Sequence, residues 1–134
     1  MEDEVGPLTT QAAALVAFVP CSDLGVASRF YGDTLGLRLL EASPFALAFD
    51  GNGTELRVTL VDRPARARYT VLGWRVPDIA TATRALRAAG VAFERYDGME
   101  QDEDDIWTAP GGSRIAWFGD PDGNIISLQQ PPEG

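Results

Sequence analysis

Ala116-Trp117-Phe118-Gly119-Asp120-Pro121-Asp122-Gly123-Asn124 is the stretch of this sequence that decides its fold. The run before Gly119 is apolar and aromatic and predicts the end of a strand. The run from Asp120 to Asn124 predicts a turn, because Asp, Pro, Gly and Asn suit turn geometry. A last strand is expected at 125–130, directly after that turn.

The residues before this stretch predict the rest of one module. A strand is expected at 69–76, and Asp78 is suited to cap the following helix, which Gly90 ends. Apolar residues recur at helical spacing and predict the buried face of this helix: Ile79, Ala82, Leu86 and Ala89. Shorter extended segments are predicted at 91–96, 106–109 and 113–118.

The first half of the chain shows the same order of elements. A strand is predicted at 14–19, and Ser22 or Asp23 is expected to cap a helix that ends at Gly36. Three strands are then predicted, at 38–41, 45–50 and 55–61. The turn Gly51-Asn52-Gly53 joins the last two as a hairpin. Phe45 and Phe49 alternate with Leu47, and which of them lines a binding surface stays open.

The two halves form an internal repeat, because the offset from Asp23 to Asp78 matches that from Gly36 to Gly90 within one residue. Two copies indicate a pair of similar modules rather than a solenoid, which needs more copies. The predicted fold class is α+β: two β-α-β-β-β modules forming a curved mixed sheet, or cup, with one helix on the outer face of each. We expect a single domain over 1–134, with modules at about 12–62 and 68–130 and a linker at 64–66.

The sequence contains no histidine and one cysteine, Cys21. Without imidazole, the common routes to a metal site and to a Ser-His or Cys-His nucleophile are closed. One cysteine also excludes an internal disulfide and a cysteine-cluster metal site. Cys21 lies between a predicted strand and a helix N-terminus, where a thiol pKa can fall. A buried inert thiol is preferred over a nucleophile, because no histidine partner exists.

The formal net charge is −9, so nucleic acid is not an expected partner, because phosphate binding needs a basic surface. The charge either attracts a cationic small molecule or only aids solubility. No apolar run reaches membrane-spanning length, and the acidic start Met1-Glu2-Asp3-Glu4 does not match a secretory signal. We therefore expect no membrane partner and a cytoplasmic location.

Several motifs together resemble the vicinal oxygen chelate superfamily, which includes glyoxalase I, extradiol dioxygenases and bleomycin-resistance proteins. The first half carries Ser22-Asp23-Leu24, Phe30-Tyr31 and Leu35-Gly36-Leu37. The second half carries Trp74-Arg75-Val76-Pro77-Asp78-Ile79, Leu86-Arg87-Ala88-Ala89-Gly90-Val91 and the stretch that opened this section. The resemblance covers roughly 15–129. It implies the cup fold, and it implies no single activity, because one scaffold hosts many chemistries.

The resemblance also implies where a metal would be held. Relatives that are metal enzymes carry histidines at the positions of Val16 and Val71 and a glutamate at that of Ser127. The fourth ligand position has no clear match, and Glu55 is the nearest carboxylate. Valine has no lone pair and neutral serine is a poor ligand, so no metal and no cofactor are expected. An all-oxygen Mg²⁺ or Ca²⁺ site built from other carboxylates is the alternative.

If these positions mark the concave face, strand alternation adds further residues to it. Those residues are Phe18, Gly73, Ile125 and Gln129. Trp74 then faces the helices and is expected to be structural. Three more aromatic residues are candidates for lining the opening, or else pack against the sheet or a partner subunit: Tyr96, Trp107 and Trp117. An apolar, aromatic face with a few polar groups is typical of a small-molecule site.

The acidic segment Glu100 to Asp105 lies next to Trp107 and has two interpretations. It is either a solvated loop or a mobile rim that attracts a cationic ligand and closes over it. Asp23 and Asp78 are assigned to helix capping only.

The favoured function is a metal-independent small-molecule binding protein of the bleomycin-resistance type, which sequesters an aromatic compound, either neutral or cationic. The alternative is a glyoxalase- or dioxygenase-like enzyme with a non-standard site, using Glu94, Asp97 or Tyr96 as acid or base. A third possibility is the family's usual metal lyase or dioxygenase. The resemblance further implies a homodimer in which cups are completed between chains.

Overall fold

The computed structural model describes residues 6–9 and 11–133. The acidic start at residues 1–4 lies outside this part of the chain. The first half contains the strands β1 (Val16–Cys21), β2 (Arg38–Ala42), β3 (Ala46–Asp50) and β4 (Glu55–Leu60), with the helices α1 (Leu24–Ala27) and η1 (Ser28–Thr34). The second half contains β5 (Thr70–Arg75), α2 (Ile79–Ala88), β6 (Trp107–Thr108), β7 (Arg114–Gly119) and β8 (Ile125–Gln130).

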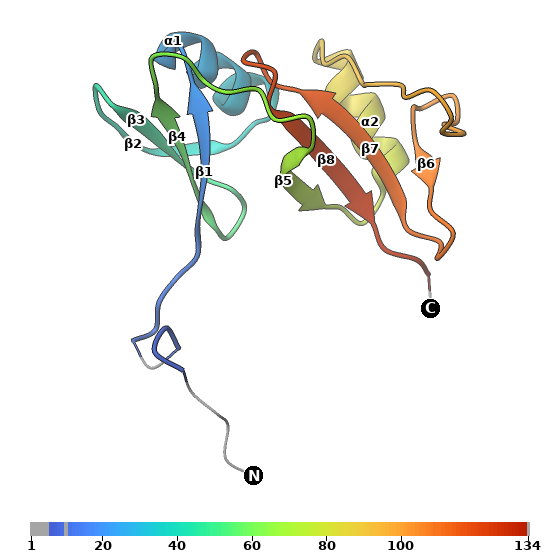
Figure 1. Cartoon of the computed structure of the whole chain (residues 1–134), viewed down its shortest axis with the longest axis horizontal. Coiled ribbons are helices and arrows are strands. Elements are labelled where there is room, and N and C mark those ends of the chain that lie inside the picture. The colour runs from blue at the N-terminus through green and yellow to red at the C-terminus, as the bar shows by residue number, and fades with distance from the viewer. Residues whose placement is uncertain (1–5, 10, 134) are drawn as a thin grey trace.

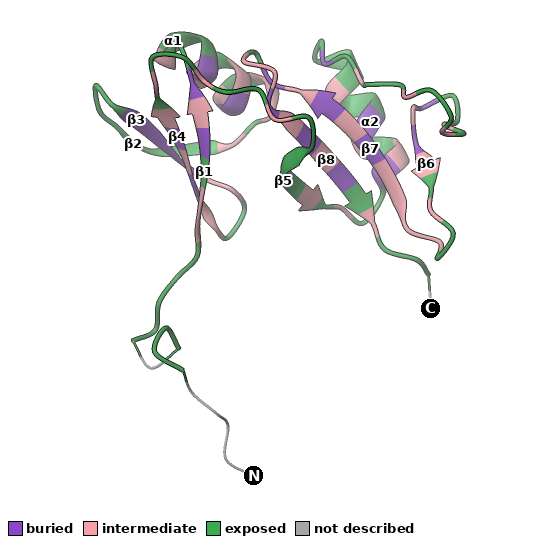
Figure 2. Ribbon diagram, in the orientation of Figure 1, coloured by how far each residue is buried: buried purple, intermediate pink, exposed green. Residues whose placement is uncertain are grey.

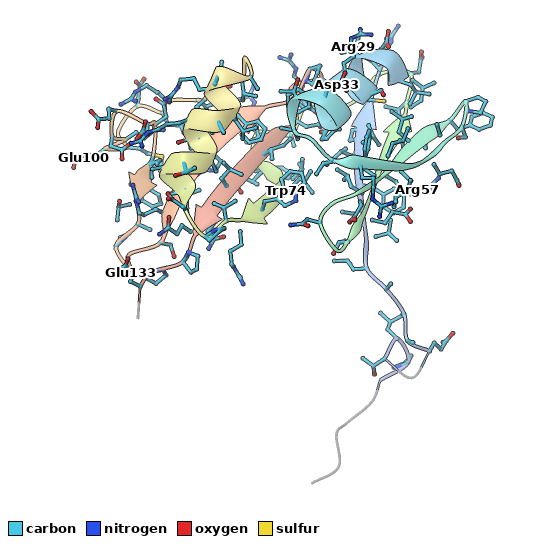
Figure 3. The ribbon with its side chains drawn as sticks, turned by 180° about the vertical axis from the view of Figure 1, so that it is seen from behind. Arg29, Asp33, Arg57, Trp74, Glu100 and Glu133 are labelled. Atoms are coloured by element: carbon cyan, nitrogen blue, oxygen red, sulfur yellow. The ribbon has the colours of Figure 1, made fainter. Side chains whose placement is uncertain are left out.

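The two halves build the same sheet twice. The first sheet has the order β1-β4-β3-β2 and the second has the order β5-β8-β7-β6. In each sheet the opening strand runs parallel to the last strand, and the other pairs are antiparallel. The predicted fold class is therefore confirmed. Figure 1 shows β1 and β5 as neighbouring edges of two inclined sheets. In the reverse view of Figure 3, α2 lies over β7 and β8.

The two helices begin and end where the sequence predicted. The carboxylates of Asp23 and Asp78 accept from the backbone N–H of Val26 and Thr81, at 3.0 and 3.2 Å. Gly36 and Gly90 follow the helices with φ of +79° and +98°, which favours glycine. The first helix widens after Ala27 into a π-helix, which the residue spacing did not predict. Ala89 is exposed at the end of α2, so its predicted place on the buried face is wrong.

Residues 91–96 form no strand, contrary to the prediction. Phe93 makes only an isolated bridge to Phe118. The Gln101 side chain instead donates to the carbonyl of Glu94 and accepts from the N–H of Tyr96. Because this amide satisfies the backbone that a neighbouring strand would pair with, the segment stays irregular.

One hydrophobic core joins both modules on the helix side of the sheets. The rings of Tyr31 and Phe49 lie 6.1 Å apart, and those of Phe30 and Phe118 lie 6.4 Å apart. Leu47 is buried with Phe49 in this core, while Phe45 is 74% exposed before β3. Figure 2 shows buried residues alternating with less buried ones along β7 and β8. One face of each sheet is therefore core, and the other face carries no helix.

The turn that decides the fold also holds the modules together. The Tyr31 hydroxyl donates to Asp120 at 2.6 Å, and the Asn124 amide donates to Asp120 and to the carbonyl of Pro20. The Ser22 hydroxyl donates to Asp122 at 2.6 Å. These bonds join the first helix and the end of β1 to the β7–β8 turn, so the motif connects modules as well as strands.

Candidate functional site

The helix-free face of the second sheet, called the open face here, gathers many of the predicted site residues. In register, Ser127 lies between Gly73 on β5 and Trp117 on β7. Gln129 lies beside Ile115, which in turn lies beside Trp107. Ile125 is next to Gly119 at the end of the same row. The neighbouring residues Ile126 and Leu128 are buried in the core, so the alternation expected from the sequence is present in β8.

Three aromatic rings pack together on this open face. Trp107 and Trp117 have ring centroids 6.2 Å apart with an interplanar angle of 34°. Tyr96 meets Trp117 edge-on, with centroids 5.5 Å apart and an angle of 77°. All three residues are half-buried, so part of each ring stays open to a ligand. Tyr96 and Ile125 also line a neighbouring groove of about 960 Å³ at the β7–β8 turn.

Gly73 leaves room for Ser127. A Cβ added at Gly73 would lie 2.6 Å from the Ser127 Oγ, closer than atoms can pack. The two residues therefore form a tight pair at the centre of the open face. The absence of a side chain at Gly73 allows the Ser127 hydroxyl to stay on that face.

The predicted residues of β1 lie on the open face of the first sheet. Val16 pairs in register with Glu55, and Phe18 pairs with Arg57. Phe18 is 63% exposed. Val71 lies where the β5–β8 register shifts, between Thr70 and Leu72, and is 38% exposed. The structure therefore does not place Val71 in the regular row that contains Gly73 and Ser127.

Arg57 is a site residue that the sequence reasoning missed. Phe18 lies as far before the capping residue Asp23 as Gly73 lies before Asp78. The strand partners of Phe18 and Gly73 are Arg57 and Ser127. The repeat therefore makes Arg57, rather than Glu55, the first-module counterpart of Ser127. Different loop lengths hide this match in the sequence, and only strand register reveals it.

The residues at the superfamily's metal positions do not fit a metal ion. Val16 and Val71 offer no lone pair, Ser127 is neutral, and Arg57 carries a positive charge. The Glu55 carboxylate accepts from the Arg57 guanidinium at 3.2 Å. Across the described residues, no three His, Cys, Asp or Glu side chains gather closely enough to hold an ion. We therefore derive no chemistry through a metal.

Asp104 and Asp105 of the acidic segment form ion pairs with arginines. At these two residues the segment is therefore neither the solvated loop nor the mobile rim that the sequence suggested. Arg84 of α2 contacts Asp104 at 2.9 Å, and Arg87 contacts Asp105 at 2.6 Å. Arg95 also pairs with Asp105. The hydrogen bond from Arg84 holds the pKa of the buried Asp104 below its usual value. These carboxylates anchor the segment to α2, so they neither face solvent freely nor face a ligand.

Trp74 and Cys21 are structural, as predicted. The Trp74 indole packs on the core and donates to the carbonyl of Gly51 at 3.0 Å. Cys21 is buried, and burial followed by the charge of Asp122 raises the pKa of its thiol. A raised pKa keeps the thiol protonated and unreactive. Burial and the nearby Glu94 also raise the pKa of Tyr96.

Comparison with known proteins now identifies the family. Residues 12–128 match the model of the Glyoxalase/Bleomycin resistance protein/Dioxygenase superfamily. This chain belongs to that superfamily. A glyoxalase/bleomycin resistance protein/dioxygenase from Alicyclobacillus acidocaldarius shares the fold, with 20% identity, a TM-score of 0.72, and coverage of 90% of this chain and 92% of that one.

Another solved structure is more similar in sequence. TnmS3, an antibiotic binding protein from Streptomyces sp. CB03234, is 31% identical, with a TM-score of 0.63, and the match covers 88% of this chain and 94% of that one. A lactoylglutathione lyase from Agrobacterium tumefaciens shares the fold at 18% identity and a TM-score of 0.68, with coverage of 89% of this chain and 93% of that one. No match was found among curated proteins.

Proposed function

We propose that this superfamily member is a metal-independent protein that binds and sequesters an aromatic small molecule. The observation that carries the proposal is the packed trio of Tyr96, Trp107 and Trp117 on the open face, next to Ser127 and Gln129. Aromatic rings stack on flat ligands, and the two polar side chains supply hydrogen bonds that fix orientation. The similarity to an antibiotic binding protein supports the same class of function.

The proposed contact residues come from both sheets. From the second sheet and its loops we propose Val71, Gly73, Tyr96, Trp107, Trp117, Ile125, Ser127 and Gln129. From β1 we propose Val16 and Phe18. A ligand that reached both sheets would also meet Arg57, which lies beside Phe18.

Binding is favoured over catalysis by the chemistry of these side chains. A general base must be unprotonated near neutral pH so that it can accept a proton. The raised pKa of Tyr96 keeps its phenol protonated. Asp104 and Asp105 are held by arginines, so they are not placed to work on a ligand. The glyoxalase- or dioxygenase-like alternative therefore loses Tyr96 as a base and would need Glu94 or Asp97 in that role.

A cationic ligand draws support only from the charge of the whole protein. The net charge of −9 attracts cations over a distance, although salt screens this effect. The acidic segment beside Trp107 gives no local attraction from Asp104 and Asp105, because both are paired. We therefore propose an aromatic ligand. A positive charge on it would speed its approach to the protein, but no local contact with Asp104 or Asp105 would bind that charge.

Pairing with a second copy is a further part of the proposal. Apolar side chains are exposed along the neighbouring edges of the two sheets: Phe18 is 63%, Tyr69 is 71% and Val71 is 38% exposed. A homodimer that covered them would remove apolar surface from water.

None of the described helices has the length and apolarity that crossing a membrane requires. The unpaired buried Cys21 is compatible with the reducing cytoplasm, where we propose the protein acts.

Calorimetry against a panel of planar aromatic antibiotics tests this function. We expect at least one compound to bind at a fixed stoichiometry and to be recovered unchanged. Trp117→Ala is expected to weaken that binding about tenfold or more, because a stacking surface is lost. Phe45→Ala is the matched control, since Phe45 is exposed outside the aromatic trio. Conversion of the compound, or equal effects of the two variants, contradicts the proposal.

A further inference from the structure

A second cavity lies between the two modules on the helix side, away from the aromatic open face. Its volume is about 570 Å³, within the range of roughly 300–1,000 Å³ typical of small-molecule sites. One wall is the end of the first helix at Leu35, Gly36 and Leu37, and the opposite wall is α2 at Ala82, Ala85 and Leu86. Figure 3 labels Trp74 in the space between α2 and the first module.

The interior of this cleft is apolar and held in shape. Phe118 and Leu128 lie beneath it, buried in the core shared by both modules. Leu35 and Leu86 both line it and are half-buried. The hydrogen bond from Trp74 to the carbonyl of Gly51 fixes the indole as part of the wall. A ligand that entered would therefore bury apolar surface without having to open the fold.

The mouth of the cleft carries an excess of positive charge. Arg38 pairs with Asp50 at 3.5 Å, and Asp50 also accepts from the N–H of Gly53. Arg75 lines the same cleft, and among the described residues no carboxylate lies within ion-pair distance of it. Among the charged residues that line this cleft, Arg38 and Arg75 outnumber Asp50, so the lining has one guanidinium in excess. The acidic surface of the protein repels an anionic ligand, but salt screens this repulsion beyond about 10 Å. The nearby guanidinium therefore determines which charge the cleft prefers in a ligand.

We propose that this cleft binds an apolar molecule that carries a single carboxylate. The hydrocarbon part lies against Leu35, Trp74 and Leu86, and the carboxylate pairs with Arg75. A guanidinium can bind a carboxylate with two parallel hydrogen bonds, which favours this anion over a neutral head group. The inference does not depend on the proposed function, because the aromatic trio and this cleft share no residue.

An NMR titration of the full-length protein with octanoate tests the site. We expect saturable shifts of the backbone amides of Gly36, Arg75 and Leu86, and none at Trp107 or Trp117. Arg75→Gln is expected to weaken octanoate binding about fivefold to tenfold and to leave the binding of octan-1-ol unchanged. Ala85→Phe, which fills the cleft from α2, is expected to weaken both probes.

Two comparisons make the test decisive. Arg63→Gln removes another exposed arginine that does not line the cleft, and it is expected to leave octanoate binding unchanged. Arg75→Gln changes an exposed side chain, so it keeps the test valid even if Ala85→Phe fails to fold. The proposal is overturned if octanoate causes no shifts, if its shifts centre on the aromatic trio, or if Arg75→Gln and Arg63→Gln have equal effects.

Discussion

Gly73 and Ser127 occupy the centre of the open face, and their close approach makes them sensitive to small changes. A Cβ at Gly73 would meet the Ser127 Oγ at 2.6 Å. Gly73→Ala is therefore expected to displace the Ser127 hydroxyl from its rotamer and to lower the free energy of unfolding by about 0.5–1.5 kcal/mol. Denaturant unfolding followed by tryptophan fluorescence measures the change.

The control for this prediction is Gly111→Ala, because Gly111 has open space around it and no positive φ. It is expected to cost little. Adding Ser127→Gly to Gly73→Ala is expected to recover part of the lost stability, since it removes the clashing atom. Equal losses at Gly73 and Gly111 would rule out the steric explanation.

For single residues, the alternation of side chains along a strand predicted which of them share the open face better than their chemical type did. Counting by two along the last strand placed Ser127 on one face with Ile125 and Gln129, and the register confirms this placement. The same counting could not reveal Arg57, because its equivalence to Ser127 depends on which residues pair across β1 and β4. The expected alternation of Phe45 and Phe49 with Leu47 was wrong, because positions 45, 47 and 49 have the same parity. Leu47 and Phe49 are both buried, and Phe45 is exposed because it lies before the strand.

Among the elements, α2 depends on the acidic segment that follows it. Arg84 holds the pKa of Asp104 below its usual value in the folded protein. A lowered folded pKa means that Asp104 adds stability above its unfolded pKa of about 4 and loses this contribution as the pH falls through the folded pKa. Asp104→Asn is therefore expected to destabilise the protein at pH 7 and to differ less from the parent at pH 3.

Urea unfolding at both pH values measures this difference. Asp97→Asn is the matched control, because it removes one exposed carboxylate of the same loop that takes part in no ion pair among the described residues. It is expected to have little effect at either pH. An Asp104→Asn deficit that is as large at pH 3 as at pH 7 contradicts the charged pairing.

Elements were predictable where local signals determine them. Helix caps at Asp23 and Asp78 and the hairpin turn after Asp50 depend on neighbouring residues, and all three are confirmed. The missing strand at 91–96 depends on the side chain of Gln101, which comes from beyond the segment and takes its backbone partners. The composition of residues 91–96 does not indicate that the Gln101 side chain will form these hydrogen bonds.

For the whole molecule, the contacts of Asp120 are the clearest link between the modules. The buried Tyr31 hydroxyl donates to Asp120, and burial and that carboxylate raise the pKa of the phenol. Tyr31→Phe is expected to lower the free energy of unfolding by about 1–3 kcal/mol, because it leaves a buried carboxylate with one partner fewer. Tyr69→Phe, at a tyrosine that is 71% exposed, should change it little.

Thermal unfolding by calorimetry measures both variants. A loss at Tyr31 that is no larger than at Tyr69 would show that the contact does not hold the modules together. The bonds from Ser22 to Asp122 and from Asn124 to the carbonyl of Pro20 would then be the side-chain links of this motif between the modules.

The proposed homodimer is also a property of the whole molecule. Phe18 and Tyr69 leave large apolar surfaces exposed in the single chain. Light scattering of the purified protein is expected to give twice the mass of one chain. Phe18→Glu is expected to shift the mass toward that of a single chain, because a charge would be buried in the interface. A monomeric parent protein contradicts the prediction.

The central claim is that the superfamily's cup binds its ligand here without a metal. Calorimetry after exhaustive chelation tests it most directly, with any planar aromatic compound that binds the untreated protein. Because Val16 and Val71 offer no lone pair and Ser127 is neutral, we expect the same affinity and stoichiometry before and after chelation. Binding that disappears with chelation and returns on adding Ni²⁺, Zn²⁺, Fe²⁺ or Mn²⁺ would contradict the claim.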